Sequence, residues 1–105
     1  MLSKPEILQQ IKSSVHATDP GATVILYGSY ARGDNREDSD IDILVLLDQE
    51  KITFDDQKRI AYPIYHIELE IDIHISPMIF SRKLWNTKHK ITPFHKNVTS
   101  EGILL

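Results

Sequence analysis

The chain contains no cysteine among its 105 residues, which excludes a disulfide framework, a thiolate nucleophile and a zinc site built on cysteine. No apolar run approaches the roughly 20 residues of a membrane span. Polar residues interrupt the N-terminal region where a signal peptide would carry its apolar core. The formal net charge of −3 gives no general attraction to nucleic acid or to an anionic membrane. We therefore expect a cytoplasmic protein with neither as a partner.

The residues that are present fit one soluble globular domain. Apolar residues make up 41% of the chain and charged residues 26%, as is ordinary for such proteins. The length of 105 residues is close to the commonest domain size. We predict a single domain over residues 1–105.

Hydrophobic spacing and turn signals predict the secondary structure. We expect a helix, a strand, a second strand, a second helix, a third strand and a third helix. This order predicts an α/β (α+β) fold with a small mixed sheet flanked by helices. The expected elements span residues 4–17, 22–27 and 41–47, a helix capped by Thr53, then residues 70–76 and 82–90.

Three further expectations concern irregular features. A short helical turn should lie around Tyr30, between the first two strands. Pro63 should kink or split the second helix, because it lacks an amide donor. The tail over residues 91–105 is too apolar for plain disorder, and we expect it to pack on the body.

Two aspartates open the second predicted strand. Asp40 and Asp42 are separated by one residue, so their side chains point to the same side, about 6–7 Å apart at the backbone. Carboxylates at this spacing can converge on one or two divalent cations. Ligands that are all oxygen favour Mg²⁺ or Mn²⁺. Alternatively, the pair is simply the polar start of an exposed strand.

A turn that suits an anion precedes these aspartates. Gly28 and Ser29 follow the first predicted strand and open a helical turn, where backbone amides and a hydroxyl can face a phosphate. An ordinary strand-to-helix turn also favours Gly and Ser. Arg32, one helical turn later, could contact a phosphate or could hold Asp38 or Asp40 in place.

These residues resemble a known motif. An apolar strand is followed by Gly28-Ser29, a ten-residue spacer and Asp40-Ile41-Asp42-Ile43. This order resembles the motif of the DNA polymerase β superfamily of nucleotidyltransferases, in particular its minimal nucleotidyltransferases. The resemblance implies a mixed sheet flanked by helices, with the site at one sheet edge. It also implies transfer of a nucleoside monophosphate from a nucleoside triphosphate to a hydroxyl, with loss of pyrophosphate.

The resemblance also assigns roles. Gly28 and Ser29 would hold the triphosphate of an NTP, for which we expect ATP. Asp40 and Asp42 would hold the metal ions. We place Arg32 and Ser39 in the same nucleotide site.

Active members of the family add a third carboxylate on a later strand. Asp72 is the candidate for this catalytic and metal-binding role, on the predicted strand over residues 70–76. Alternatively, Asp72 lies on a solvent-facing side of an edge strand with Glu70 and His74. His74 could occupy the aligned position instead, as a neighbour of the site.

Two functions from different classes follow. The first is a nucleotidyltransferase whose acceptor binds through a second chain, because the domain has little room for an acceptor site. The resemblance suggests a helical HEPN-type toxin, with this chain as the antitoxin that modifies it. The second is a binding module with a weak or inactive nucleotide site that neutralises a helical partner by contact. Formation of a homo-oligomer is left open.

Overall fold

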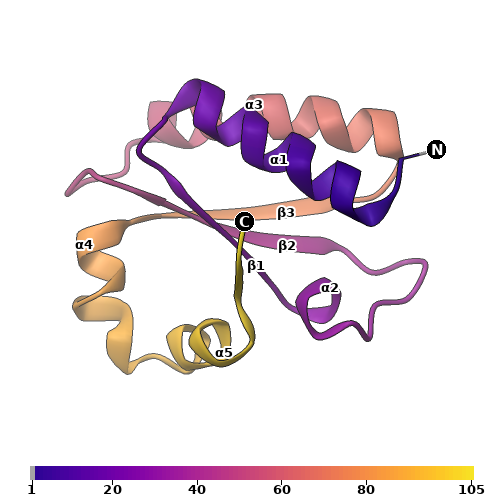
Figure 1. Ribbon diagram of the computed structural model, residues 1–105. Coiled ribbons are helices and arrows are strands. Elements are labelled where there is room, and N and C mark those ends of the chain that lie inside the picture. Colours follow the sequence, from indigo (N-terminus) through magenta and orange to yellow (C-terminus); the bar gives the residue numbers. More distant parts are fainter. Residues whose placement is uncertain (1) are drawn as a thin grey trace.

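The computed structural model describes residues 2–105 and shows a mixed sheet with helices on both faces (Figure 1). Its strands are β1 (Thr23–Tyr27), β2 (Ile41–Leu47), β3 (Ile75–Ser81) and β4 (Ile103–Leu104). The order across the sheet is β3-β2-β1-β4. Strand β1 is antiparallel to both of its neighbours, and β3 is parallel to β2. The predicted α/β fold with a small mixed sheet is confirmed.

The helices divide between the two faces of the sheet. The long helices α1 (Lys4–Thr18) and α3 (Phe54–Ile71) lie side by side over one face. The shorter α4 (Arg82–Trp85) and α5 (Pro93–Glu101) lie against the other face (Figure 1). The four-residue helix α2 (Ser29–Arg32) stands at the end of β1. Across residues 2–105, no helix combines the length and the apolar character that crossing a membrane requires.

Both long helices begin at a capping box. Ser3 accepts a hydrogen bond from the amide of Glu6, and the Glu6 carboxylate accepts one from the amide of Ser3. Thr53 and Asp56 exchange the same pair of bonds at the start of α3. Each box satisfies amides that the first turn of a helix leaves without partners. The predicted starts of both helices are therefore confirmed.

Strand β2 is buried on both faces, as its continuous apolar run predicts. Successive side chains of a strand point to opposite faces. Ile43 and Val45 belong to the cluster beneath α1 and α3, whereas Leu44 packs with Trp85 on the side of α4 and α5. The same alternation places Asp42 on the α4–α5 side, near the beginning of β2.

The third strand does not occupy the predicted residues 70–76. Helix α3 continues to Ile71, Asp72 follows in the left-handed conformation with φ 55°, and β3 begins only at Ile75. The strand prediction is wrong because Ile67 and Ile71 also continue the helical spacing of the apolar residues in α3. This longer pattern prevails over the period of two.

Helix α3 is not split at Pro63. The helix is continuous from Phe54 to Ile71, although proline contributes no amide donor. The buried side chains of Ile60 and Ile64 anchor the helix on both sides of the proline. The expected break therefore does not occur.

The last 24 residues complete the second layer. The predicted helix over residues 82–90 divides into α4 and a 3₁₀ segment, Lys88–Ile91. The tail packs on the body as expected, but through two elements that the sequence did not predict. These are α5 and the short strand β4, which pairs with β1.

The left-handed conformation of Asp72 gives a first test. We expect Asp72→Gly to leave the free energy of unfolding unchanged or to raise it by up to about 1 kcal/mol, because this position at the end of a helix favours glycine. The matched change Gln57→Gly, on an exposed face inside α3, should lower it by about 1 kcal/mol. Urea unfolding measures both. A clear loss of stability in Asp72→Gly would contradict the helix end described here.

Candidate functional site

Asp42 lies directly against the backbone of Gly28. The pairing of β1 with β2 places Tyr27 opposite Asp42, and Gly28 follows with φ 76° and ψ −157°. A Cβ atom at Gly28 would overlap Oδ2 of Asp42. Only glycine combines this backbone conformation with so close an approach. The turn after β1 and the carboxylate on β2 therefore form one unit.

Helix α2 is a single turn that begins at this glycine. The amides of Ala31 and Arg32 both donate to the carbonyl of Gly28, and Gly33 ends the turn in the left-handed conformation. Among residues 2–105, the amides of Ser29 and Tyr30 donate to no protein acceptor. The predicted helical turn is present, and its first two amides are available to an anion.

Asp40 and Asp42 differ in their surroundings. Asp40 is exposed before β2, whereas Asp42 is half-buried. Burial raises the pKa of the Asp42 carboxyl above its ordinary value, and the charge of Asp40 raises it further. The charges of Arg32 and His74 act in the opposite direction on this pKa. A half-buried carboxyl with a raised pKa beside a second carboxylate is a common feature of functional sites.

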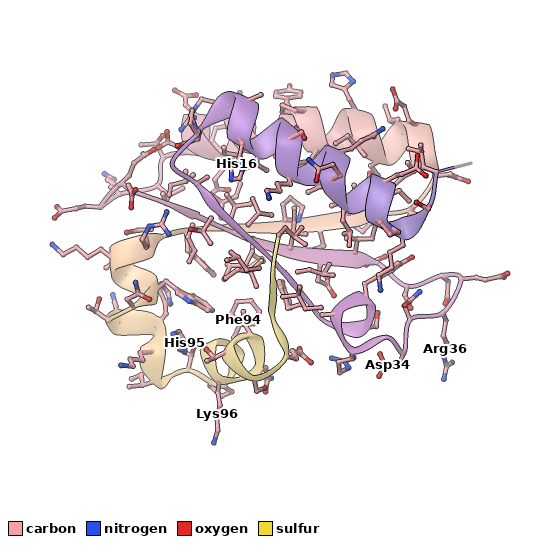
Figure 2. All side chains as sticks on the ribbon, viewed as in Figure 1. His16, Asp34, Arg36, Phe94, His95 and Lys96 are labelled. Carbon is pink, nitrogen blue, oxygen red and sulfur yellow. The ribbon has the colours of Figure 1, made fainter. Side chains whose placement is uncertain are left out.

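Asp42 also influences the tyrosine opposite it. Burial, with the charge of Asp42 as the second cause, raises the pKa of Tyr27 to about 12. The ring of Tyr27 meets that of Phe94 edge to face, with centroids 5.3 Å apart. Figure 2 shows Phe94 pointing from α5 towards the sheet. Helix α5 thus closes one side of the site with an apolar contact.

Arg32 is held by two carboxylates that its sequence position did not suggest. Its Nη1 donates to Glu101 Oε2 at 2.7 Å, and its Nε donates to Asp34 Oδ2 at 3.1 Å. The second oxygen of Glu101 accepts from the amide of Gly28 at 3.3 Å. Sequence reasoning missed Glu101, because 73 residues separate it from Gly28. Strand β4 begins two residues after Glu101, and its pairing with β1 brings Glu101 to the site.

The loop after α2 is polar and projects from the body. Figure 2 shows Asp34 and Arg36 on this loop, away from the sheet. Ser39, predicted to bind nucleotide, accepts a hydrogen bond from the amide of Arg36 at 2.7 Å. Its own amide donates to the carbonyl of Arg36. In this structure Ser39 therefore shapes the loop that leads to Asp40.

Asp72 is not brought to the two aspartates. It follows α3 and lines a pocket with Leu2, Ile7 and Gln10. Across residues 2–105, no three His, Asp or Glu side chains are grouped so that they could hold one metal ion. The predicted set of three carboxylates is therefore not assembled, and the structure groups Gly28, Ser29, Asp40 and Asp42 without Asp72.

The strand beside Asp42 carries other polar residues. In the parallel register of β2 and β3, Asp42 is the partner of Ser76. The carbonyl of His74 accepts from the amide of Ile41 at 2.9 Å, just before β3 begins. The His74 ring contacts Glu68 of α3, with Nδ1 2.9 Å from Oε2. Sequence reasoning did not find this contact, because Glu68 falls inside a helix with no motif.

Comparisons with known proteins agree on one family. A family model described as "Nucleotidyltransferase domain" matches residues 8–105. The Methanocaldococcus jannaschii protein named "Putative protein adenylyltransferase MJ0141" is 37% identical over 81 residues, which cover 75% of this chain and 81% of that protein.

Two solved structures share the fold. One, described as "Structure of putative minimal nucleotidyltransferase", has a TM-score of 0.62 at 24% identity and covers 99% of this chain and 97% of its own. The other, described as "Crystal structure of the toxin-antitoxin with AMP-PNP", has a TM-score of 0.62 at 20% identity and covers 91% of this chain and 69% of its own. At these identities the likeness concerns the fold alone.

The contact between Gly28 and Asp42 can be tested with two glycines. Gly28→Ala should lower the free energy of unfolding by roughly 1–3 kcal/mol through backbone strain, and by more because the new Cβ would meet Oδ2 of Asp42. Gly33→Ala is the matched control. It also has positive φ, at 82°, but a Cβ there has no neighbour within 4 Å, so only about 1–2 kcal/mol is expected. Equal losses in urea unfolding would contradict the close contact.

The raised pKa of Asp42 predicts a stability change that depends on pH. At neutral pH the fold opposes ionisation of Asp42, so Asp42→Asn should raise the melting temperature of the metal-free protein. The stability of the wild type should fall as the pH rises through the raised pKa. Below the ordinary pKa of aspartate, both folded and unfolded chains carry the proton, so the advantage of Asn should disappear. The loop variant Asp38→Asn serves as control, and an advantage that persists at low pH would contradict the assignment.

Proposed function

The chain belongs to the family of nucleotidyltransferase domains, and on this premise we propose that it transfers a nucleoside monophosphate from ATP to a hydroxyl of a partner protein. One observation carries the proposal. The carboxylate of Asp42 lies against Gly28, which begins the turn whose first two amides, those of Ser29 and Tyr30, have no protein acceptor among residues 2–105. A cation on the aspartates and a phosphate on the amides would therefore be neighbours, as a metal-bound triphosphate requires.

Asp40 and Asp42 are suited to hold Mg²⁺ or Mn²⁺. Their donors are all carboxylate oxygen, which these cations prefer. Burial and then the charge of Asp40 raise the pKa of the Asp42 carboxyl, and a bound cation would favour the ionised form of both groups. When bound, such an ion supplies charge stabilisation to the phosphates and to the attacking and leaving oxygens. Asp72 has no part in this proposal, because it lies apart from the pair.

Gly28, Ser29 and Arg32 would hold the phosphates. The amide of Gly28 and the guanidinium of Arg32 now bind Glu101, whose carboxylate presents two anionic oxygens to them. A phosphate oxygen can take the place of this carboxylate, because it offers the same hydrogen-bond acceptors. In the reaction, the acceptor oxygen forms a bond to the α-phosphorus while the bond to the bridging oxygen breaks and pyrophosphate leaves.

The acceptor is the less defined half of the proposal. The name of the M. jannaschii relative supports a protein acceptor and an adenylyl group. The similar structure solved as a toxin–antitoxin pair with AMP-PNP supports both a nucleotide and a protein partner. We propose a helical toxin of the HEPN type as the partner, with this chain as its antitoxin.

A second candidate function is neutralisation of the partner by contact alone. The outer side of α3 exposes four large apolar side chains, at 52–71% of their surface. Exposed apolar groups that gather on one helix are typical of protein interfaces. They are Phe54, Tyr62, Tyr65 and Leu69.

Label transfer distinguishes the two functions. Incubation with Mg²⁺ and ATP labelled at the α-phosphate should release pyrophosphate and label the partner. The double variant Asp40→Asn with Asp42→Asn should lower the rate by at least about 100-fold, because each carboxylate holds the cation. The matched pair Asp55→Asn with Glu37→Gln, at exposed positions, should retain the rate.

The single variant Asp72→Asn tests the role that the sequence suggested for this residue, and its rate should remain near that of the wild type. If the partner is inhibited without label, and equally by the Asp40/Asp42 variant, contact is the function and the enzymatic proposal fails.

A further inference from the structure

A carboxylate of the chain itself occupies two of the donors that the proposed function assigns to phosphates. Glu101 is the last residue of α5, and its side chain is 20% exposed. Its Oε2 accepts a hydrogen bond from Nη1 of Arg32 at 2.7 Å, and its Oε1 accepts one from the amide of Gly28 at 3.3 Å. Each oxygen of the carboxylate is therefore held by a donor from the turn that follows β1.

The backbone next to Glu101 is fixed by packing against β1. The amide of Gly102 donates to the carbonyl of Val98 at 2.7 Å. A Cβ atom at Gly102 would overlap both that carbonyl oxygen and Cγ2 of Ile25 on β1. The fold thus places Glu101 beside Gly28. The side chain of Glu101 has its own rotatable bonds, so the carboxylate can turn away from the donors without a change in the sheet.

A second carboxylate on Arg32 provides a comparison within the same chain. Asp34 accepts from Nε of Arg32 at 3.1 Å, and its side chain is 62% exposed. Among residues 2–105, the Asp34 carboxylate accepts from Arg32 but not from Gly28. Both acids therefore neutralise the guanidinium, whereas only Glu101 occupies the backbone donor as well.

The Glu101 carboxylate and a phosphate would compete for these donors. Both are anions that accept charge-assisted hydrogen bonds from a guanidinium and from amides. They carry charge of the same sign, so a carboxylate that stayed beside a bound phosphate would repel it. A triphosphate offers more charge and more acceptor oxygens than one carboxylate, which lets it take over the donors. Its binding then requires Glu101 to leave, and the loss of that contact lowers the affinity.

We propose that Glu101 is an internal competitor for the phosphate donors, which closes the site in the nucleotide-free chain and is displaced by the triphosphate. This inference rests on the proposed function, which supplies the identity of the ligand. A carboxylate that only positioned Arg32 for the phosphates would have the opposite effect, because its removal would weaken binding. The direction of the change in affinity separates the two roles.

The test compares affinities in the presence of Mg²⁺ by isothermal titration calorimetry. The variants are Glu101→Gln, which removes the competing charge, and Asp34→Asn, the matched control on the same arginine. The ligands are ATP and inorganic tripolyphosphate, which carries the phosphates without the nucleoside. The melting temperature of each protein is measured with and without ligand, and only folded variants are compared.

We expect Glu101→Gln to bind both ligands about 5-fold more tightly, because a partly exposed ion pair is worth up to about this factor. The same variant should melt at a lower temperature than the wild type without ligand, since it loses the contact, and should gain more from the ligand. Asp34→Asn should change either affinity by less than about 2-fold. Opposite signs for stability and affinity are the signature of a competitor.

Three outcomes overturn the inference: an unchanged affinity in Glu101→Gln, a weaker affinity in that variant, or an equal gain in Asp34→Asn, which would reduce the effect to charge alone. A result in which tripolyphosphate binds as expected but ATP binds to no variant would refute the proposed function and leave the competition for phosphate intact. If neither ligand binds to any folded variant, both proposals fail.

Discussion

The approach of Asp42 to Gly28 is the constraint on which the rest of the site depends. It requires a residue without a side chain at the end of β1, a left-handed φ there, and antiparallel pairing that puts Tyr27 opposite Asp42. Together these three conditions fix where α2 begins relative to the carboxylate. A bound phosphate and a bound cation would then need no further adjustment of the backbone to lie next to each other.

The charges of the site are balanced by parts of the chain that are distant in sequence. Asp42 is half-buried beside another carboxylate, and the fold offsets this cost with Arg32 and His74. Arg32 is in turn held by Glu101, the last residue of α5. Strand β4 begins two residues after Glu101 and pairs with β1. The last strand of the sheet therefore also positions the Glu101 carboxylate against the Gly28 amide and the Arg32 guanidinium.

The sequence predicted the local half of the site and not the long-range half. Gly28 and Asp42 carry their own signals, a turn glycine after one apolar strand and alternate acids at the start of the next, and these two strands are consecutive along the chain. Glu101 and Glu68 have no such signal, since only tertiary pairing gives them partners. The stretch around Asp72 fits both a period of two and the end of a helix. The burial of Ile67 in the core decides in favour of the helix, and local sequence rules alone do not distinguish the two patterns.

Helix α3 connects the two halves of the proposed reaction. Its inner side supplies Ile60 and Ile64 to the core, and from its last turns Glu68 reaches the start of β3 beside the aspartates. Its outer side exposes Tyr65 and Leu69, the neighbours of Glu68 along the helix. A partner that covers this apolar side would therefore lie next to Glu68, whose carboxylate accepts from the amide of Ile75 at the start of β3. In the proposed reaction, the nucleotide-binding half needs no partner for its geometry, whereas the acceptor hydroxyl would come from the partner.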